Sequence, residues 1–168
     1  ADPLLQFTDS TVDTGRNFLL LSSSIGELPS LTLSGALLTA TNTDFTAGDA
    51  ENRNSFLFVE DGGTLKSTAA DPLVTFENST LDTGGNFLTI RRSSGTPSTV
   101  EIAGPLLKAT DSSFTTADCC SFLFLGESAE LKGSGTQPLF QFTGSTFNVG
   151  ADFVTLAAGA PGPSVMDL

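Results

Sequence analysis

The feature that most constrains this chain is a segment that occurs three times with small changes. Residues 3–21 read PLLQFTDSTVDTGRNFLLL, residues 72–90 read PLVTFENSTLDTGGNFLTI, and residues 138–156 read PLFQFTGSTFNVGADFVTL. Repetition of this kind is typical of architectures in which each unit buries its apolar face only against its neighbours. The chain is therefore expected to fold as an array of stacked units.

The whole chain divides into five units, which we place at 3–35, 36–71, 72–104, 105–137 and 138–168. Units one and three are most alike, and units two and four form a second pair (ALLTATNTDF and PLLKATDSSF). The offset within both pairs is 69 residues, which indicates that a two-unit segment was duplicated. The last unit stops at SVMDL, inside its final strand, so we expect either part of a longer array or a subunit with an open end.

Within each unit, short runs rich in Val, Ile, Phe and Thr alternate with Gly, Ser, Asp and Asn. This pattern predicts β-strands joined by turns, and no segment shows a sustained helical period. In unit one we expect strands at Leu4–Thr8, Ser10–Val12, Phe18–Leu21 and Ser30–Leu33. A propeller blade needs four longer antiparallel strands, so these short repeated strands favour a parallel β-solenoid.

Alignment of the units produces columns of like apolar residues. One column holds phenylalanine in every unit: Phe18, Phe56, Phe87, Phe122 and Phe153. Two more columns are Leu5, Leu38, Val74, Leu107 and Phe140, and Leu31, Leu65, Val100, Leu131 and Val165. Because parallel strands in register place equivalent residues about 4.8 Å apart, such columns become apolar ladders. We predict an all-β parallel β-helix (β-solenoid) of about five coils of ~33 residues, right-handed as parallel crossovers usually are.

Two further columns exchange volume between units. The first reads Phe7, Ala40, Phe76, Ala109 and Phe142, and the second reads Val12, Phe45, Leu81, Phe114 and Phe147. Units two and four also carry Phe58 and Phe124 where the other units have Leu20, Thr89 and Thr155. Since close-packed interiors tolerate neither voids nor overfilling, we expect all these positions to face one shared interior.

A polar column marks one corner of every unit. Its members are Asp9, Asn42, Asn78, Asp111 and Gly144, and the residues that follow them are Ser10, Thr43, Ser79, Ser112 and Ser145. Asn, Asp and Gly are turn residues, and small hydroxyl groups can bond to the backbone at a corner. We therefore expect a stacked turn at this position.

The motif PLLxFTxSTxxTGxxFL, its stacked columns and the Ser/Thr/Gly-rich, Lys-poor composition carry a family resemblance. They resemble the β-strand repeats of bacterial filamentous-haemagglutinin-like proteins and autotransporter passenger domains. The resemblance covers essentially the whole chain. It implies a secreted or surface-displayed right-handed parallel β-helix that serves as a stalk, adhesin or filament.

The composition argues against several classes of function. The net charge is −12, with 19 acidic and 7 basic residues, whereas phosphate contacts require Lys and Arg. The sequence has no His, which excludes Ser-His-Asp and Cys-His arrangements and the commonest metal ligand. No apolar run approaches the ~20 residues of a membrane helix. We expect no enzyme activity, no cofactor, no metal, no nucleic-acid partner and no membrane insertion.

Two functions of other β-solenoids are weaker alternatives. Glu60–Asp61, with the loop acids Asp49 and Glu51, could form the acid/base pair of a polysaccharide-cleaving enzyme, but adjacent acids are more simply solvated turn residues. Ice binding needs a flat array of Thr, and the outward pairs are Gln6/Thr8, Thr39/Thr41, Thr75/Glu77, Lys108/Thr110 and Gln141/Thr143. Glu77 and Lys108 would interrupt such a face.

Cys119 and Cys120 are the two cysteines of the chain. Neighbouring residues of a strand point to opposite faces, so we expect one of the two side chains to be buried and the other exposed. Three states remain open for the pair: a vicinal disulfide, a bridge to another chain, or two reduced thiols.

The loop at 47–55 is the most distinctive connection between strands. Unit two reads TAGDAENRN at this place, five residues longer than the tight turns DTGR, DTGG and NVGA of the odd units. A variable loop on a rigid scaffold is the usual place for specific binding. Asp49, Glu51 and Arg53 are therefore candidate contacts to a glycan or a protein.

The ends of the array suggest how the chain works. Neither end shows a capping helix or a charged terminal unit, which natural solenoids use to prevent edge-to-edge association. We therefore predict a structural, non-enzymatic building block of an extracellular filament or surface fibre, whose partner is another copy or a longer solenoid. The alternative is a cell-surface adhesin stalk that binds its ligand through the loop at 47–55.

Overall fold

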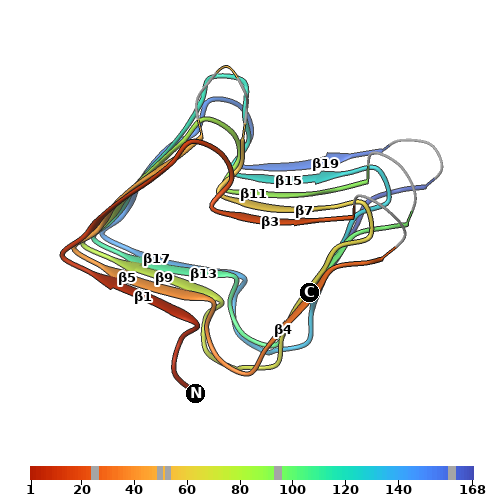
Figure 1. The fold of residues 1–168 in the computed structure, drawn as a ribbon, viewed down its shortest axis with the longest axis horizontal. Helices are drawn as coiled ribbons and strands as arrows, with labels where there is room; N and C mark the ends of the chain where they lie inside the picture. Colours follow the sequence, from red (N-terminus) through yellow and green to blue (C-terminus); the bar gives the residue numbers. More distant parts are fainter. Residues whose placement is uncertain (24–26, 49–50, 52–53, 93–95, 159–161) are drawn as a thin grey trace.

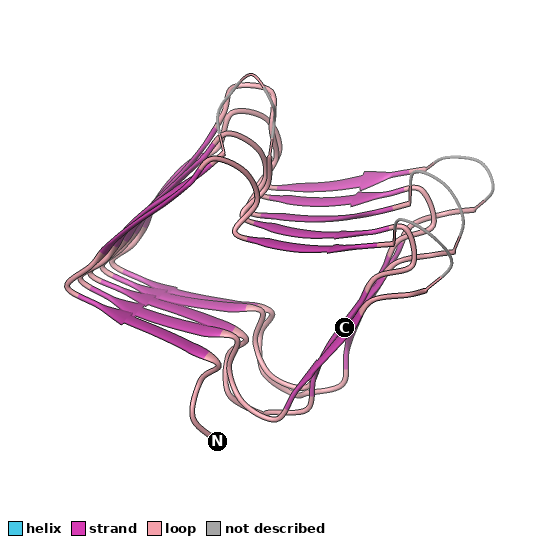
Figure 2. Ribbon diagram, in the orientation of Figure 1, coloured by secondary structure: helices cyan, strands magenta, loops and turns pink. Residues whose placement is uncertain are grey.

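The computed structural model describes residues 1–23, 27–48, 51, 54–92, 96–158 and 162–168. The chain winds through five coils, and each coil contributes one strand to each of four parallel, five-stranded sheets (Figure 1). This β-solenoid is the all-β fold that the repeats predicted. The described residues contain no helix (Figure 2), and so none that is long and apolar enough to cross a membrane.

The four sheets, A to D, form the sides of every coil. Sheet A contains β1 (Leu5–Thr8), β5 (Leu38–Thr41), β9 (Val74–Glu77), β13 (Leu107–Thr110) and β17 (Phe140–Thr143). Sheet B contains β2 (Thr11–Thr14), β6 (Asp44–Ala47), β10 (Thr80–Thr83), β14 (Ser113–Thr116) and β18 (Thr146–Asn148). Sheet C contains β3 (Leu19–Ser22), β7 (Leu57–Glu60), β11 (Leu88–Arg91), β15 (Leu123–Gly126) and β19 (Val154–Ala157). Sheet D contains β4 (Ser30–Leu33), β8 (Thr64–Ser67), β12 (Thr99–Ile102), β16 (Glu130–Gly133) and β20 (Val165–Asp167).

Strand pairing places equivalent residues of successive coils beside one another. In sheet A, Leu5 lies beside Leu38 and Leu38 beside Val74. In sheet B, Val12 lies beside Phe45. The predicted apolar columns of sheets A and B are confirmed over all five coils.

The column in sheet D was predicted with a wrong last member. β16 pairs with β20 so that Leu131 lies beside Met166, and Val165 lies beside Glu130. Met166 packs against the core, whereas Val165 is 39% exposed. The connection before β20 is as long as those before β4 and β12, so counting from sheet C places Met166 in the column, and the error of one residue exchanged the two faces of the strand.

The strand bounds also differ from the expectation in coil one. β2 runs from Thr11 to Thr14, whereas a strand over Ser10–Val12 followed by a tight turn was expected. Asp13 continues the ladder and lies beside Thr46 of the next coil. Exposed polar residues at the end of a half-buried strand look like turn residues in the sequence, and only the pairing with the next coil shows that they extend the strand.

The phenylalanine column stacks ring on ring along the interior. Ring centroids are 4.7 Å apart for Phe18 and Phe56, 5.8 Å for Phe56 and Phe87, 4.7 Å for Phe87 and Phe122, and 4.9 Å for Phe122 and Phe153. The three middle rings are fully buried, and Phe153 in the last coil is 38% exposed. Offset stacking of this kind contributes to stability beyond the burial of area.

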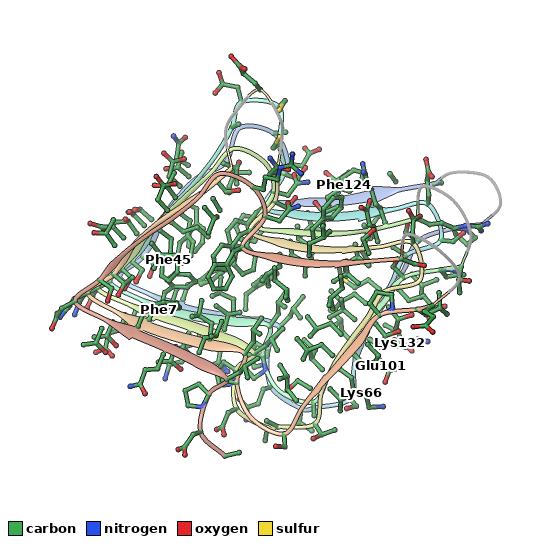
Figure 3. All side chains as sticks on the ribbon, viewed as in Figure 1. Phe7, Phe45, Lys66, Glu101, Phe124 and Lys132 are labelled. Carbon is green, nitrogen blue, oxygen red and sulfur yellow. The ribbon has the colours of Figure 1, made fainter. Side chains whose placement is uncertain are left out.

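The expected exchange of volume is confirmed between sheets A and B. The ring centroid of Phe45 in coil two lies 5.5 Å from that of Phe7 in coil one and 5.4 Å from that of Phe76 in coil three, and the ring planes are nearly perpendicular in both pairs. Its ring therefore occupies space that the small, fully buried Ala40 leaves in its own coil. Phe7 and Phe45 both point into the interior (Figure 3).

A ladder of hydroxyl groups closes the corner between sheets A and B, as the polar column predicted. Ser79 Oγ donates to Glu77 O at 2.7 Å and accepts from Thr43 N at 3.0 Å. The residue before each hydroxyl has a positive φ, which is 47° at Asn78 and 62° at Gly144. Asn, Asp and Gly are the residues that adopt this left-handed conformation at least cost.

We expect Phe87→Ala to lower the free energy of unfolding by about 3–5 kcal/mol, because a fully buried ring is replaced by a cavity. Phe153→Ala removes the same side chain from the half-open last coil, and its loss should be clearly smaller. Urea unfolding followed by circular dichroism measures both. A loss below about 1 kcal/mol for Phe87→Ala would show that the column does not carry the core.

Candidate functional site

The two outer coils present interior apolar residues to solvent. Leu5 of coil one is 37% exposed, although its neighbour Leu38 in the same column is fully buried. In coil five, Phe142, Phe153 and Leu156 are 38%, 38% and 54% exposed. The exposure follows from position in the stack, because the equivalent residues of the middle coils are covered on both sides.

Each outer coil also carries the outermost strand of all four sheets. β1, β2, β3 and β4 form one coil edge, and β17, β18, β19 and β20 form the other. A strand at the edge of a sheet offers N–H and C=O groups that can pair with a further strand. The two coil edges therefore combine apolar surface with backbone hydrogen-bonding groups, and they are the candidate functional site.

The loop at 47–55 lies between β6 and β7 and is longer than the equivalent connection of coil three, in agreement with the sequence. Gly48 has a φ of 70°, and a Cβ atom there would lie 2.6 Å from Asn54 Cβ, so the two ends of the loop are in close contact. Of the candidate binding residues, Glu51 is exposed, and Asp49 and Arg53 lie outside the described residues.

The prediction that Phe58 and Phe124 face the shared interior was wrong. Leu57 and Val59 point into the interior, so Phe58 between them lies on the outer face of sheet C. Phe124 lies on the same outer face (Figure 3), two coils further along. The two rings flank Thr89, which is only 4% exposed. The interior volume is therefore balanced between sheets A and B alone.

Both outer rings are packed against the surface of sheet C, along a shallow groove of about 370 Å³. The Arg91 guanidinium lies 4.8 Å above the centroid of the Phe58 ring, a cation–π contact. A Cβ atom at Gly126 would lie 2.6 Å from Phe124 Cε1, so the glycine makes room for this ring. These contacts cover the rings and stabilise the sheet.

A ladder of amide and hydroxyl groups at the corner before sheet C was missed by the sequence analysis. Asn86 Oδ1 accepts from Ser121 N at 2.7 Å, and Asn86 Nδ2 donates to Thr89 Oγ1 at 2.7 Å. Asn17 Oδ1 accepts from Ser55 N at 2.8 Å in the same way. The signal was present in the residues that precede the core phenylalanines: Asn17, Ser55, Asn86, Ser121 and Asp152.

Glu60, one of the acids considered for catalysis, forms an ion pair with the next coil. Arg91 Nη2 lies 3.2 Å and Arg91 Nε 3.3 Å from Glu60 Oε2. Asp61 has a φ of 50° in the turn after β7. Within the described part of the chain, no group of three or more His, Cys, Asp or Glu residues is placed to hold a metal ion.

A column of alternating charge runs along the outer face of sheet D: Lys66, Glu101, Lys132 and Asp167. The first three of these side chains lie on the outside of the coil in Figure 3. Lys66 Nζ lies 2.7 Å from Glu101 Oε2, and this hydrogen bond lowers the pKa of the Glu101 carboxyl. Lys132 Nζ lies 2.5 Å from Glu130 Oε2, which raises the pKa of the Lys132 amino group. These pairs are exposed, so each contributes little to stability.

The two cysteines lie in a turn, residues 117–120, and not in a strand as the argument from alternation assumed. Cys120 N donates to Ala117 O at 2.9 Å and closes this cysteine turn. Cys119 is exposed and Cys120 is 6% exposed. Their sulfur atoms lie 2.7 Å apart.

Comparisons of the chain with protein-family models, with curated proteins and with solved structures found no match.

We expect Lys66→Ala to raise the pKa of Glu101 toward its ordinary value of 4.5, because the hydrogen bond from Lys66 is the main cause of the lowering. Lys132→Ala, the matched control, removes a weaker influence and should change this pKa less. An NMR titration of the Glu101 carboxyl carbon measures both shifts. If Lys132→Ala has the larger effect, the charge of the next coil and not the hydrogen bond controls Glu101.

The sign of the accompanying effect on stability follows from the direction of the shift. The pKa of Glu101 is lower in the folded state than in the unfolded state. Its small contribution to stability is therefore fully present above the unfolded-state pKa, and is lost as pH falls through the folded-state pKa. Lys66→Ala should reduce the pH dependence of unfolding in this acidic range.

Proposed function

We propose that this chain is a structural, non-enzymatic building block of an extracellular filament or surface fibre, and that copies associate end to end through their coil edges. The exposure of interior apolar residues at both outer coils is the observation that carries the proposal. Burial of apolar area contributes roughly 25 cal/mol per Å². Covering each edge with a further coil is therefore favourable.

The parallel direction of the strands supports head-to-tail stacking. A second copy placed on the last coil continues all four sheets without any change of strand direction. If the internal register is kept, Phe140 lies beside the next copy's Leu5, and Phe142 beside the next copy's Phe7. Such a contact joins two different surfaces, does not close on itself and produces an open filament.

The two coil edges also differ in bulk, as neighbouring coils do inside the chain. Coil five has Phe140 and Phe147 where coil one has Leu5 and Val12. In a head-to-tail stack, these bulky column ends lie against the smaller ones. The second column of sheet A behaves differently, because Phe142 meets the next copy's Phe7 there, whereas Phe and Ala alternate in this column inside the chain.

The resemblance to secreted and surface-displayed β-helices supports an extracellular location for such a fibre.

The dimensions of the fibre follow from the strand spacing. Five coils of ~4.8 Å add about 24 Å of length for every copy.

We expect the chain to form fibres in negative-stain electron micrographs, with an axial repeat near 24 Å from the strand spacing. Leu156→Lys should abolish them, because an unpaired ammonium group would be buried between two coils at a cost of several kcal/mol. Thr46→Lys adds the same charge to the exposed outer face of β6 and should leave the fibres intact.

A mixing experiment tests the polarity of the stack. Leu5→Lys blocks the edge opposite to that blocked by Leu156→Lys, so each variant keeps one functional edge. Neither variant should form fibres alone, and an equimolar mixture should stop at dimers in sedimentation velocity. If the unsubstituted chain stays monomeric at all concentrations, end-to-end self-association is wrong.

A second candidate function is that of a cell-surface adhesin stalk that binds a glycan or a protein through the loop at 47–55. The length of this loop and the exposure of Glu51 favour it. Replacing residues 48–55 by GGN, the shorter connection at 84–86, should abolish binding to a glycan array and leave the circular dichroism spectrum unchanged. Binding that survives the replacement would exclude the loop.

A further inference from the structure

The cysteine turn joins β14 to β15 in coil four, away from both coil edges. Its two thiols are in contact but differ in exposure. The sulfur atoms lie 2.7 Å apart, Cys119 is exposed, and Cys120 is 6% exposed. One thiol can therefore meet a solute from solvent while the other cannot.

Hydrogen bonds fix the backbone of the buried cysteine. Cys120 N donates to Ala117 O at 2.9 Å within the turn. Cys120 O accepts from Thr116 Oγ1 at 3.0 Å and from Ala151 N at 3.0 Å. Since these partners belong to coils four and five, the backbone of Cys120 cannot move outward without breaking hydrogen bonds in both.

The neighbouring coils enclose the cysteine turn closely. Cys120 Sγ lies 4.0 Å from Gly84 O of coil three. On the other side, a Cβ atom at Gly150 would lie 2.1 Å from Ala117 O, so the backbones of coils four and five are in contact. A cysteine of another chain cannot approach Cys120 in this position, but Cys119 Sγ is already beside it.

We propose that Cys119 and Cys120 are a redox pair that forms a reversible vicinal disulfide. Cys119 meets the oxidant and Cys120 resolves the oxidised sulfur. Solvent-exposed thiols are oxidised more readily than buried ones, so Cys119 is the thiol that reacts first with the oxidant. A thiol within the same turn has a much higher effective concentration than a thiol of another chain, which selects Cys120 as the second.

The reaction balances with hydrogen peroxide as the oxidant. The Cys119 thiolate attacks one peroxide oxygen, the O–O bond breaks, and the hydroxide that leaves is protonated to water. Cys119 is then a sulfenic acid. The Cys120 sulfur attacks Cys119 Sγ, the S–S bond forms as the S–O bond breaks, and the hydroxyl group leaves as water with the Cys120 proton. Two thiols lose two electrons in total, and one peroxide becomes two waters.

Covalent geometry makes this disulfide easy to reduce. Adjacent Cα atoms are about 3.8 Å apart, less than the roughly 4.4–6.8 Å that disulfides usually span. The bond is therefore strained, and strained disulfides are the labile ones. It encloses no loop, so the chain-entropy argument assigns it no stabilisation. Its effect is to protect the exposed thiol from cross-linking to other chains.

The decisive measurement is the state of the thiols in the unsubstituted protein. The folded protein is treated with hydrogen peroxide, unfolded in the presence of an alkylating reagent, and examined by intact-mass spectrometry. We expect a monomer that has lost two hydrogen atoms and carries no alkyl group, and reduction by a phosphine should restore two alkylation sites. Two alkyl groups after peroxide treatment, or a covalent dimer, would overturn the proposal.

Single substitutions test the two roles, with circular dichroism as the check on folding. Cys120→Ser leaves the exposed thiol without a resolving partner, so a sulfenic acid trapped by dimedone or a disulfide-linked dimer should accumulate. Cys119→Ser leaves the buried thiol, and the rate of peroxide consumption should fall at least about tenfold. If Cys119→Ser consumes peroxide as fast as the unsubstituted protein, Cys119 is not the first thiol and the assignment of roles is wrong.

Discussion

The rest of this structure depends on the in-register pairing of parallel strands between successive coils. Backbone hydrogen bonds hold each residue beside its equivalent in the next coil, at the ordinary strand spacing of about 4.8 Å. Each residue in a column must therefore pack against, or bond to, the equivalent residue of the next coil. Phenylalanine stacks on phenylalanine along the interior, serine bonds to serine or threonine at the corner, and charges in the column from Lys66 to Asp167 alternate in sign. The repetition of the sequence is the chemical consequence of this pairing.

The same constraint explains why the repeats are not identical. A column of phenylalanine in every coil of sheet A and of sheet B would overfill the interior, so coil two combines Ala40 with Phe45. The Phe45 ring then contacts phenylalanine side chains of both neighbouring coils. Because each coil is complete only between two others, the outer coils retain apolar surface, and the proposed association extends the same packing from one chain to the next. The cysteine turn does not depend on this repeated packing in the same way, because its proposed chemistry depends on one local turn that the stacked coils hold in place.

Some features of the candidate site could be predicted from the sequence, and others could not, for identifiable physical reasons. The stack of coils, and with it the presence of two outermost coils in the structure, follows from the repeats themselves. Phe58 was assigned to the wrong face because the run from Leu57 to Val59 is apolar throughout and shows no alternation. Val165 was chosen in place of Met166 although the connections before β4, β12 and β20 are equally long, and this error of one residue exchanged the faces of the strand. The amide ladder at Asn86 was overlooked because its column mixes Asn, Ser and Asp before the core phenylalanines and so does not repeat one residue type.

The sequence by itself determined the number of coils, the columns of sheets A and B and the stacked corner. In-register pairing requires similar residues at equivalent positions of every coil, so each of these features appears as a repeat in the sequence. Only the tertiary structure decided which residues cover the outer face of sheet C, how far the strands extend, and that Cys119 and Cys120 meet in a turn with Cys120 as the buried member of the pair. These features depend on contacts between coils and on the conformation of single turns. The paired cysteines occur in one coil alone, and the polar residues that end the strands look like turn residues, so neither feature gives a clear pattern in the sequence.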